Sequence, residues 1–260
     1  MIRTAVRTTP FLLAALLFAA PASAQIVQSV NFGIGGSFPR GINSRVDGDV
    51  LVANLNQPAL DQFLPEEIIT TSLDFDIKKF RGWNVFGEWN IGFGDRLELG
   101  VGGSYYSRTV HSRYRDLEHG LRPSAPDIEQ DLRLRVIPIT AVVRFLPFGR
   151  PSDFQPYVGL GVGILNFRYS ETGEFVDPDT LDIFDNRIAP LRPFVAKGTT
   201  AGPLVLGGLR MPLGGDIYAF TLEGRYQWGS GETGGAANEF LGDKIDLGGG
   251  QLNFGFLVRF

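Results

Sequence analysis

The last nine residues of the chain, from Leu252 to Phe260, alternate between two kinds of side chain. One set is apolar and the other is polar or small, with Leu257 as the single exception. Because successive side chains of a β-strand point to opposite faces, the segment predicts a strand with one apolar and one polar face. The apolar face turns toward a core in a soluble protein and toward lipid in a membrane barrel. Its members are Leu252, Phe254, Phe256, Val258 and Phe260.

The first 24 residues have the three parts of a secretory signal peptide. Arg3 and Arg7 precede an apolar stretch at residues 11–20, and the small residues Ala22-Ser23-Ala24 follow it. The apolar stretch is too short to span a bilayer as a helix, and no later segment is long enough either. We therefore predict a signal peptide at residues 1–24 and one mature domain at residues 25–260.

Patterns of period two predict eight strands, and the connections between them alternate in length. Connections after the second, fourth and sixth strands are short, whereas the other four are long and cover residues 39–80, 109–129, 170–201 and 229–243. Such an alternation of short and long connections is not expected in a soluble β-sandwich. The predicted strands lie near residues 26–38, 81–93, 97–108, 130–146, 157–169, 202–213, 218–228 and 244–260.

The fourth predicted strand changes phase in its middle. Leu132, Leu134 and Val136 share one face, but the apolar residues at every second position of 139–145 share the next one. One extra residue in the strand would produce this shift, and proline is tolerated at such irregularities. We therefore predict a β-bulge at Pro138.

The composition restricts the chemistry. The chain has no cysteine, which excludes disulfides, thiolate metal sites and thiol nucleophiles. It carries a formal net charge of −4 and no block of Lys and Arg, so we expect no nucleic-acid partner. Glycine is abundant, at 34 residues, and 21 phenylalanines outnumber 7 tyrosines. These residues suit closely packed barrel walls with an outer face in hydrocarbon.

Together, the signal peptide, the alternating strands, the unequal connections and the terminal Phe260 resemble a small bacterial outer-membrane β-barrel of the OmpA, OmpX and OmpW kind. The resemblance implies an all-β fold, an eight-stranded antiparallel up-and-down transmembrane β-barrel, with short turns in the periplasm and long loops outside the cell. It implies that the barrel-assembly machinery reads an assembly signal carried by Phe256, Val258 and Phe260. We expect a stand-alone, monomeric barrel domain in the bacterial cell outer membrane, in contact with membrane lipid and lipopolysaccharide.

The polar faces of the predicted strands direct ten charged residues into the lumen. An eight-stranded barrel is just wide enough for side chains to fill, and a lone buried charge costs several kcal/mol. We therefore predict a structural Arg/Glu network that fills and hydrates the lumen and excludes a wide pore, although an ion-pair gate that opens would give a small conductance. The predicted members are Glu88, Glu98, Arg108, Arg133, Arg135, Arg144, Arg210, Glu223, Arg225 and Arg259.

Seven aromatic residues fall near the ends of three predicted strands. Trp and Tyr gather at the two interfaces of a bilayer, so we predict aromatic girdles rather than a ligand platform. The residues are Trp83, Trp89, Phe93, Tyr105, Tyr218, Tyr226 and Trp228.

Three chemical motifs have simpler interpretations. Residues 159–163 alternate glycine as a dinucleotide fingerprint does, but no helix follows, so we interpret them as barrel wall. The acidic run at residues 171–185 lacks the register of a calcium loop and favours a solvated loop, with weak divalent-ion binding as the alternative. His111 and His119 lie near serines and acidic residues, the one place where a Ser/His/acid arrangement could form.

These observations favour a non-enzymatic outer-membrane protein with a structural or surface-interaction role through its extracellular loops. We predict no catalytic residue, cofactor or metal site. Two alternatives stay open: a narrow, porin-like channel for small solutes, and a lipid A-modifying enzyme that uses His111 or His119. The first long connection, residues 39–80, is rich in apolar residues and either folds over the barrel mouth or binds a partner.

Overall fold

The computed structural model describes residues 26–40, 77–113, 129–176, 187–188, 192–234, 237, 240 and 244–260. The predicted signal peptide at residues 1–24 lies outside the described residues. Eight long strands make up the main sheet. They are β1 (Ile26–Pro39), β2 (Gly82–Phe93), β3 (Leu97–Arg113), β4 (Glu129–Phe145), β5 (Gln155–Gly173), β8 (Phe194–Pro212), β9 (Tyr218–Gln227) and β12 (Gly249–Arg259).

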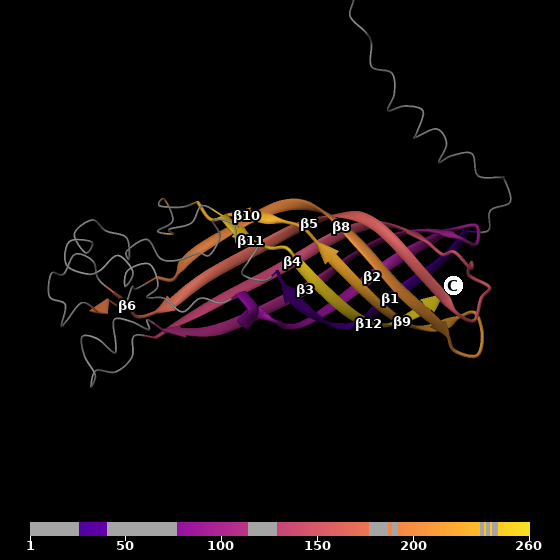
Figure 1. Ribbon diagram of the computed structural model, residues 1–260, viewed down its shortest axis with the longest axis horizontal. Coiled ribbons are helices and arrows are strands. Elements are labelled where there is room, and N and C mark those ends of the chain that lie inside the picture. The colour runs from indigo at the N-terminus through magenta and orange to yellow at the C-terminus, as the bar shows by residue number, and fades with distance from the viewer. Residues whose placement is uncertain are drawn as a thin grey trace, which may run out of the picture.

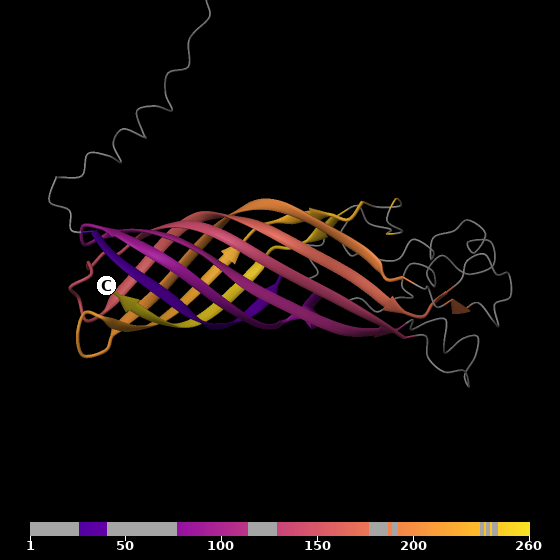
Figure 2. The same ribbon diagram turned by 180° about the vertical axis from the view of Figure 1, so that it is seen from behind.

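These strands close into a ring in the order β1-β12-β9-β8-β5-β4-β3-β2, with every neighbouring pair antiparallel. The barrel is elongated, and its strands run obliquely to its long axis (Figure 1 and Figure 2). The predicted all-β, eight-stranded antiparallel barrel is therefore confirmed. Smaller elements accompany it: the 3-10 helix η3 (Ile77–Phe80), β6 (Phe175–Val176) paired with β7 (Arg187–Ile188), and β10 (Ser230–Glu232) paired with β11 (Lys244–Asp246).

Short turns join the strands at one end of the barrel, where the C-terminus also lies (Figure 1). Gly94 in the β2–β3 turn has a φ of 59°, and Gly214 in the β8–β9 turn has a φ of 62°. Glycine adopts these left-handed angles without a Cβ clash, so the chain reverses within a few residues. Outer-membrane barrels keep their short turns in the periplasm, so we refer to this end as the periplasmic end.

The outer surface carries a belt of exposed apolar side chains. On β5, for example, Leu160 and Val162 are 67% and 61% exposed. A continuous apolar surface of this extent is unfavourable in water, so the belt faces hydrocarbon. Members on other strands include Phe32, Ile34, Val85, Val101, Ile139, Val143, Val205, Phe220 and Phe254.

No helix in the described part of the chain is long and apolar enough to cross a bilayer.

The predicted bulge at Pro138 is wrong. β4 keeps one continuous register with both β3 and β5 through this position. The apolar residues change face because the surroundings of the strand change. On the periplasmic side of Pro138 they point outward to lipid, whereas Leu132, Leu134 and Val136 are buried inside the barrel. β4 therefore leaves the bilayer near Pro138 and continues as the wall of a water-exposed barrel.

Three other strands also continue into segments predicted as connections. β3 runs to Arg113, β5 runs to Gly173, and β8 begins at Phe194 instead of near residue 202. In these extensions the outward residues are mostly polar, which in sequence looks like a loop. The barrel wall is consequently taller on the side of β3, β4, β5 and β8 than on the side of β1, β2, β9 and β12.

The extracellular half of the lumen is filled by an apolar cluster, which we call the upper core. Three of its members, Phe80, Phe240 and Ile245, come from connections between barrel strands, and the Tyr106 hydroxyl donates a hydrogen bond to the Phe80 carbonyl. Most of the first long connection, residues 41–76, lies outside the described residues. The upper core consists of Phe80, Tyr106, Val110, Leu132, Leu134, Val136, Leu165, Phe167, Tyr169, Ala196, Phe240 and Ile245.

Candidate functional site

The periplasmic half of the lumen is filled by charged side chains around Arg144 of β4. The Arg144 Nη2 atom lies 2.6 Å from Glu88 Oε1 of β2 and 2.9 Å from Glu223 Oε2 of β9. Its Nη1 donates a hydrogen bond of 2.8 Å to Asn90 Oδ1. Arg144, Glu88 and Glu223 are almost fully buried, so each charge depends on these partners for its stability.

Two further arginines complete the arrangement. Arg210 of β8 donates two hydrogen bonds to the Glu98 carboxylate of β3, one of them from Nη1 at 2.7 Å. Arg225 of β9 places its Nη2 2.7 Å from Glu88 Oε2 and also pairs with Glu223. Three arginines thus pair with three glutamates, which stabilises these buried charges. We call these six residues the lumen network: Glu88, Glu98, Arg144, Arg210, Glu223 and Arg225.

The lumen network crosses the barrel instead of following its wall. In the ring of strands, β5 and β8 separate β4 from β9, and β4 and β5 separate β3 from β8. The Tyr157 ring of β5 fills the remaining space, with its centroid 5.5 Å from the Arg144 guanidinium carbon and 5.0 Å from that of Arg210. Its hydroxyl donates a 3.1 Å hydrogen bond to Glu223. These side chains close the cross-section of the lumen.

Inward-facing glycines make room for the lumen network. A Cβ atom on Gly100 would lie 2.5 Å from Arg144 Nη1, and a Cβ atom on Gly102 would lie 2.8 Å from the Glu88 Cβ. Non-bonded carbon and nitrogen atoms do not approach so closely, so any larger residue would displace a charged side chain. Part of the high glycine content therefore reflects how large ionic side chains are packed into a narrow barrel.

The other four residues predicted for the lumen lie outside this network. Arg259 faces inward near the periplasmic end and donates a 2.6 Å hydrogen bond to Gln155 Oε1. Arg108 is exposed and makes no ion pair with a described residue. The prediction is wrong for Arg133 and Arg135, which lie on the outer face of β4. The error follows from the predicted bulge, because an unbroken register reverses the face of both side chains.

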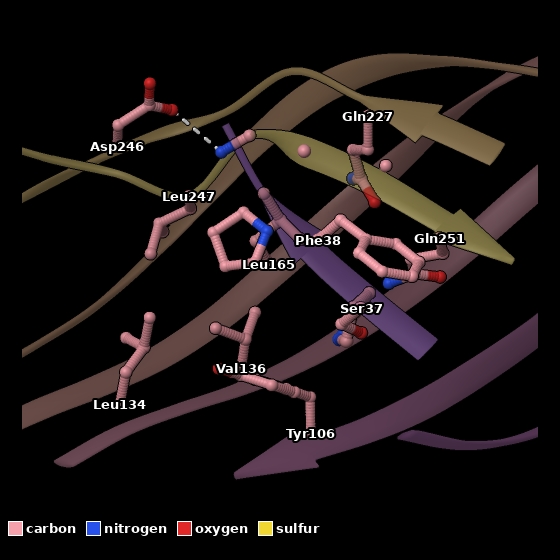
Figure 3. A pocket seen from close by; sticks show the side chains of 15 residues that line it. Ser37, Phe38, Tyr106, Leu134, Val136, Leu165, Gln227, Asp246, Leu247 and Gln251 are labelled. Atoms are coloured by element: carbon pink, nitrogen blue, oxygen red, sulfur yellow. Dashed lines mark hydrogen bonds between the residues drawn. The ribbon is translucent and has the colours of Figure 1, made fainter. Parts of the chain in front are cut away.

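A pocket of about 60 Å³ lies beside the upper core, on the side toward the lumen network (Figure 3). Leu134, Val136 and Leu165 line one part of it, and the amides of Gln227 and Gln251 line another. The volume holds a few water molecules but no larger solute. A smaller void of about 10 Å³ lies on the network side of the pocket. Through the described residues, the lumen is therefore interrupted by two packed layers.

One carboxyl group is buried in the upper core. Glu171 accepts a 2.7 Å hydrogen bond from the Tyr169 hydroxyl, and both side chains are fully buried. The pair lies on the extracellular extension of β5, beyond the last apolar belt residue of that strand, Ile164. Burial raises the pKa of Glu171 to about 8, and the hydrogen bond from Tyr169 only partly opposes this effect.

We expect the extracellular end of β5 to lose protection against hydrogen exchange as the pH rises. The Glu171 carboxyl titrates near 4.5 when unfolded and near 8 when folded. Because the pKa of Glu171 is higher in the folded state, protonation of this carboxyl favours folding. The resulting stabilisation is complete below pH 4.5 and is lost as the pH rises through 8. Protection factors of residues 167–173 should therefore fall between about pH 5 and about pH 9. Glu171→Gln should remove the dependence, whereas Glu129→Gln, an exposed control, should keep it; a pH-independent wild type would contradict the assignment.

His111 does not form a Ser/His/acid arrangement with the described residues around it. Its side chain is exposed on the outer face of the barrel and pairs with Asp131 across the β3–β4 ladder. Ser112 is buried on the opposite face of β3, out of reach of the His111 ring. His119 and most of the acidic run lie outside the described residues. Among the described residues, no group of three or more His, Cys, Asp and Glu side chains could hold a metal ion.

The aromatic residues predicted as girdles lie on the outer face of the barrel. Two of them are near the periplasmic turns, four are near the opposite edge of the apolar belt, and Trp89 lies between. Two separated groups of this kind are what the two interfaces of a bilayer favour. The periplasmic pair is Phe93 and Tyr218, and the opposite group is Trp83, Tyr105, Tyr226 and Trp228.

No protein-family model matches the chain, and no curated protein matches it. Among solved structures, the outer membrane protein OprG from Pseudomonas aeruginosa matches with a TM-score of 0.50 and 16% sequence identity, over 91% of this chain and 97% of OprG. This chain has the fold of a small outer-membrane β-barrel. Because only helices and closed barrels satisfy their backbone groups in lipid, the fold and the apolar belt together place it in the bacterial outer membrane.

Two further structures match less closely. The N-terminal β-barrel domain of Pseudomonas aeruginosa OprF has a TM-score of 0.39 and 9% identity, over 92% of this chain and 100% of that domain. Neisserial surface protein A has a TM-score of 0.41 and 14% identity, over 90% of this chain and 96% of its own.

Proposed function

We propose that this protein is a non-enzymatic outer-membrane barrel with a closed lumen, which contributes to envelope integrity or to surface interaction through its extracellular end. The observation that carries the proposal is the lumen network, in which Arg144 joins Glu88 and Glu223 across the barrel. The upper core forms a second, apolar closure above it. Pores for solutes need many more strands than eight to leave an aqueous channel.

The non-enzymatic part of the proposal rests on the surroundings of His111. Its partner Asp131 is on the outer wall, and the neighbouring serine, Ser112, faces the interior. A nucleophile and its base must lie within hydrogen-bond reach of each other, so these residues do not act as a catalytic unit. A channel role is likewise less favoured, because the pocket of about 60 Å³ is followed toward the lumen network only by a void of about 10 Å³ beside Arg225.

The proposal also covers how the barrel is assembled and what surrounds it in the membrane. Phe256 packs on the outer face against the rings of Phe32, Tyr218 and Phe220, at centroid distances of 6.1, 5.7 and 5.9 Å. Phe260 is 72% exposed at the end of β12. Such an apolar edge, with Val258 beside it, is a surface that the barrel-assembly machinery would bind before the barrel closes. In the membrane, the protein would be a monomer surrounded by lipid and lipopolysaccharide.

Planar-bilayer recordings test the closed lumen. We expect the purified full-length protein to give no steady conductance above that of a protein-free bilayer, because the network and the upper core interrupt the lumen twice. A general porin inserted under the same conditions provides the positive control. Arg144→Ala combined with Glu223→Ala should add at most brief openings, since the upper core stays in place. Large, steady currents through the wild-type protein would favour the channel alternative over our proposal.

A further inference from the structure

The outer wall above the apolar belt carries a cluster of basic side chains. Arg133 and Arg135 of β4, Arg168 of β5 and Lys197 of β8 form this cluster, which we call the basic patch. Arg133, Arg168 and Lys197 are exposed, and Arg135 is partly exposed. The three arginines and Ser170 line a hollow of about 290 Å³. The barrel therefore presents a concave basic surface on its outside.

The β-sheet register holds these like charges next to one another. Arg135 lies directly opposite Arg168, which in turn lies directly opposite Lys197. Like charges at directly opposite positions repel, because their Cβ atoms are only about 5 Å apart. None of the four side chains pairs with a carboxylate in the described part of the chain, and Asp131, the next acidic residue on this face of β4, pairs with His111. An external anion would relieve this repulsion.

The height of the basic patch relative to the bilayer indicates which anion this is. The outward residue that precedes Arg135 toward the membrane is Ile137, and on β5 the exposed Ile164 lies two outward positions from Arg168. Outward positions on one strand are about 7 Å apart, so the patch begins just beyond the hydrocarbon edge. It lies toward the end away from the periplasmic turns, which is the level of the outer-leaflet headgroups.

We propose that the basic patch binds the phosphate groups of an anionic glycolipid in the outer leaflet. Guanidinium groups donate paired hydrogen bonds to phosphate oxygens, and the Ser170 hydroxyl adds a donor in the same hollow. The acyl chains of this lipid lie against belt residues such as Ile139 and Ile164. A membrane lipid fits better than a soluble anion because the hollow lies on the wall beside the belt. The inference is independent of whether the lumen conducts.

Lipid retention measured by native mass spectrometry tests the proposal. The full-length protein is placed in phosphatidylcholine nanodiscs with either bisphosphorylated lipid A or its dephosphorylated form, which has the same acyl chains. We expect preferential retention of the phosphorylated lipid. Each basic residue near an anionic surface contributes roughly a factor of five in affinity, so Arg133→Gln, Arg135→Gln and Arg168→Gln combined should weaken binding by roughly 100-fold.

A matched triple variant removes the same charge elsewhere. Arg81→Gln, Arg96→Gln and Lys244→Gln replace three exposed cations outside the patch and should change the affinity by less than about twofold. Heat-modifiable migration on a gel verifies that both triple variants fold. Equal retention of the two lipids or an unaffected patch variant would each overturn the assignment to an outer-leaflet glycolipid.

Discussion

Replacing Arg144 with Gln is expected to destabilise the folded barrel by about 3 to 5 kcal/mol, because it removes one of the two arginines that pair with the buried carboxylates of Glu88 and Glu223. Arg144 contacts Glu88 and Glu223 inside the lumen, where both carboxylates are about 2 to 4% exposed. Glutamine keeps most of the volume but none of the charge, so Glu88 and Glu223 are left with Arg225 as their shared cationic partner. The loss should therefore come from charge imbalance and not from an empty space.

Urea unfolding in lipid vesicles, followed by tryptophan fluorescence, measures this effect. Arg259→Gln is the matched control, because the bonds of Arg259 within the described part of the chain go to neutral groups, Gln155 and the Asp216 carbonyl, and its loss should cost about 1 kcal/mol. Arg144→Gln combined with Glu223→Gln should recover part of the stability, since it restores the balance of charge. Equal destabilisation by Arg144→Gln and Arg259→Gln would show that the lumen network does not hold the barrel closed.

A cationic residue in the apolar belt should also impair folding strongly. Leu160 is 67% exposed on the outer face of β5, well inside the belt, and Leu160→Arg should cost ~2 to 4 kcal/mol if this position is near the bilayer midplane. Thr172 is exposed on the outer face of the same strand but beyond the belt. Thr172→Arg should therefore fold almost as well as the wild-type protein.

The yield of heat-modifiable, folded protein after refolding into vesicles compares the two variants. Both variants introduce arginine into β5, so a difference in their folded yield reports only the surroundings of the substituted position. If Leu160→Arg and Thr172→Arg refold equally well, the belt at β5 does not face hydrocarbon.

Much of the barrel could be predicted from sequence, because period-two alternation reports directly which face of a strand meets lipid. In β12, the outward Phe254 and the inward Asn253 follow the pattern. All six charged residues of the lumen network could be placed on inward faces for the same reason. Glu88 and Glu223 occupy polar positions on strands whose apolar face is unambiguous. The alternation does not show which arginine pairs with which glutamate, because the partners come from strands that are distant in sequence.

The prediction from period-two alternation was wrong where a strand leaves the membrane. In β4, the apolar residues change from the outer to the inner face at Pro138. The sequence pattern is the same for a bulge as for a strand that passes from lipid into water, so it does not distinguish the two. The upper core and the basic patch were both missed for this reason. An inward Leu134 and an outward Arg135 are the normal arrangement of a barrel in water, and they become visible only once the register is known.

The sequence by itself determined the membrane-spanning part of this protein: strand number, lipid-facing residues and the end at which the turns are short. Alternation, glycine turns and chain length are local properties, so they can be read along the chain. Only the tertiary structure decided the height of the wall, the balance of three arginines with three glutamates across the lumen, and the alignment of Arg135, Arg168 and Lys197. These depend on the register between strands, which is set by the closure of the whole ring.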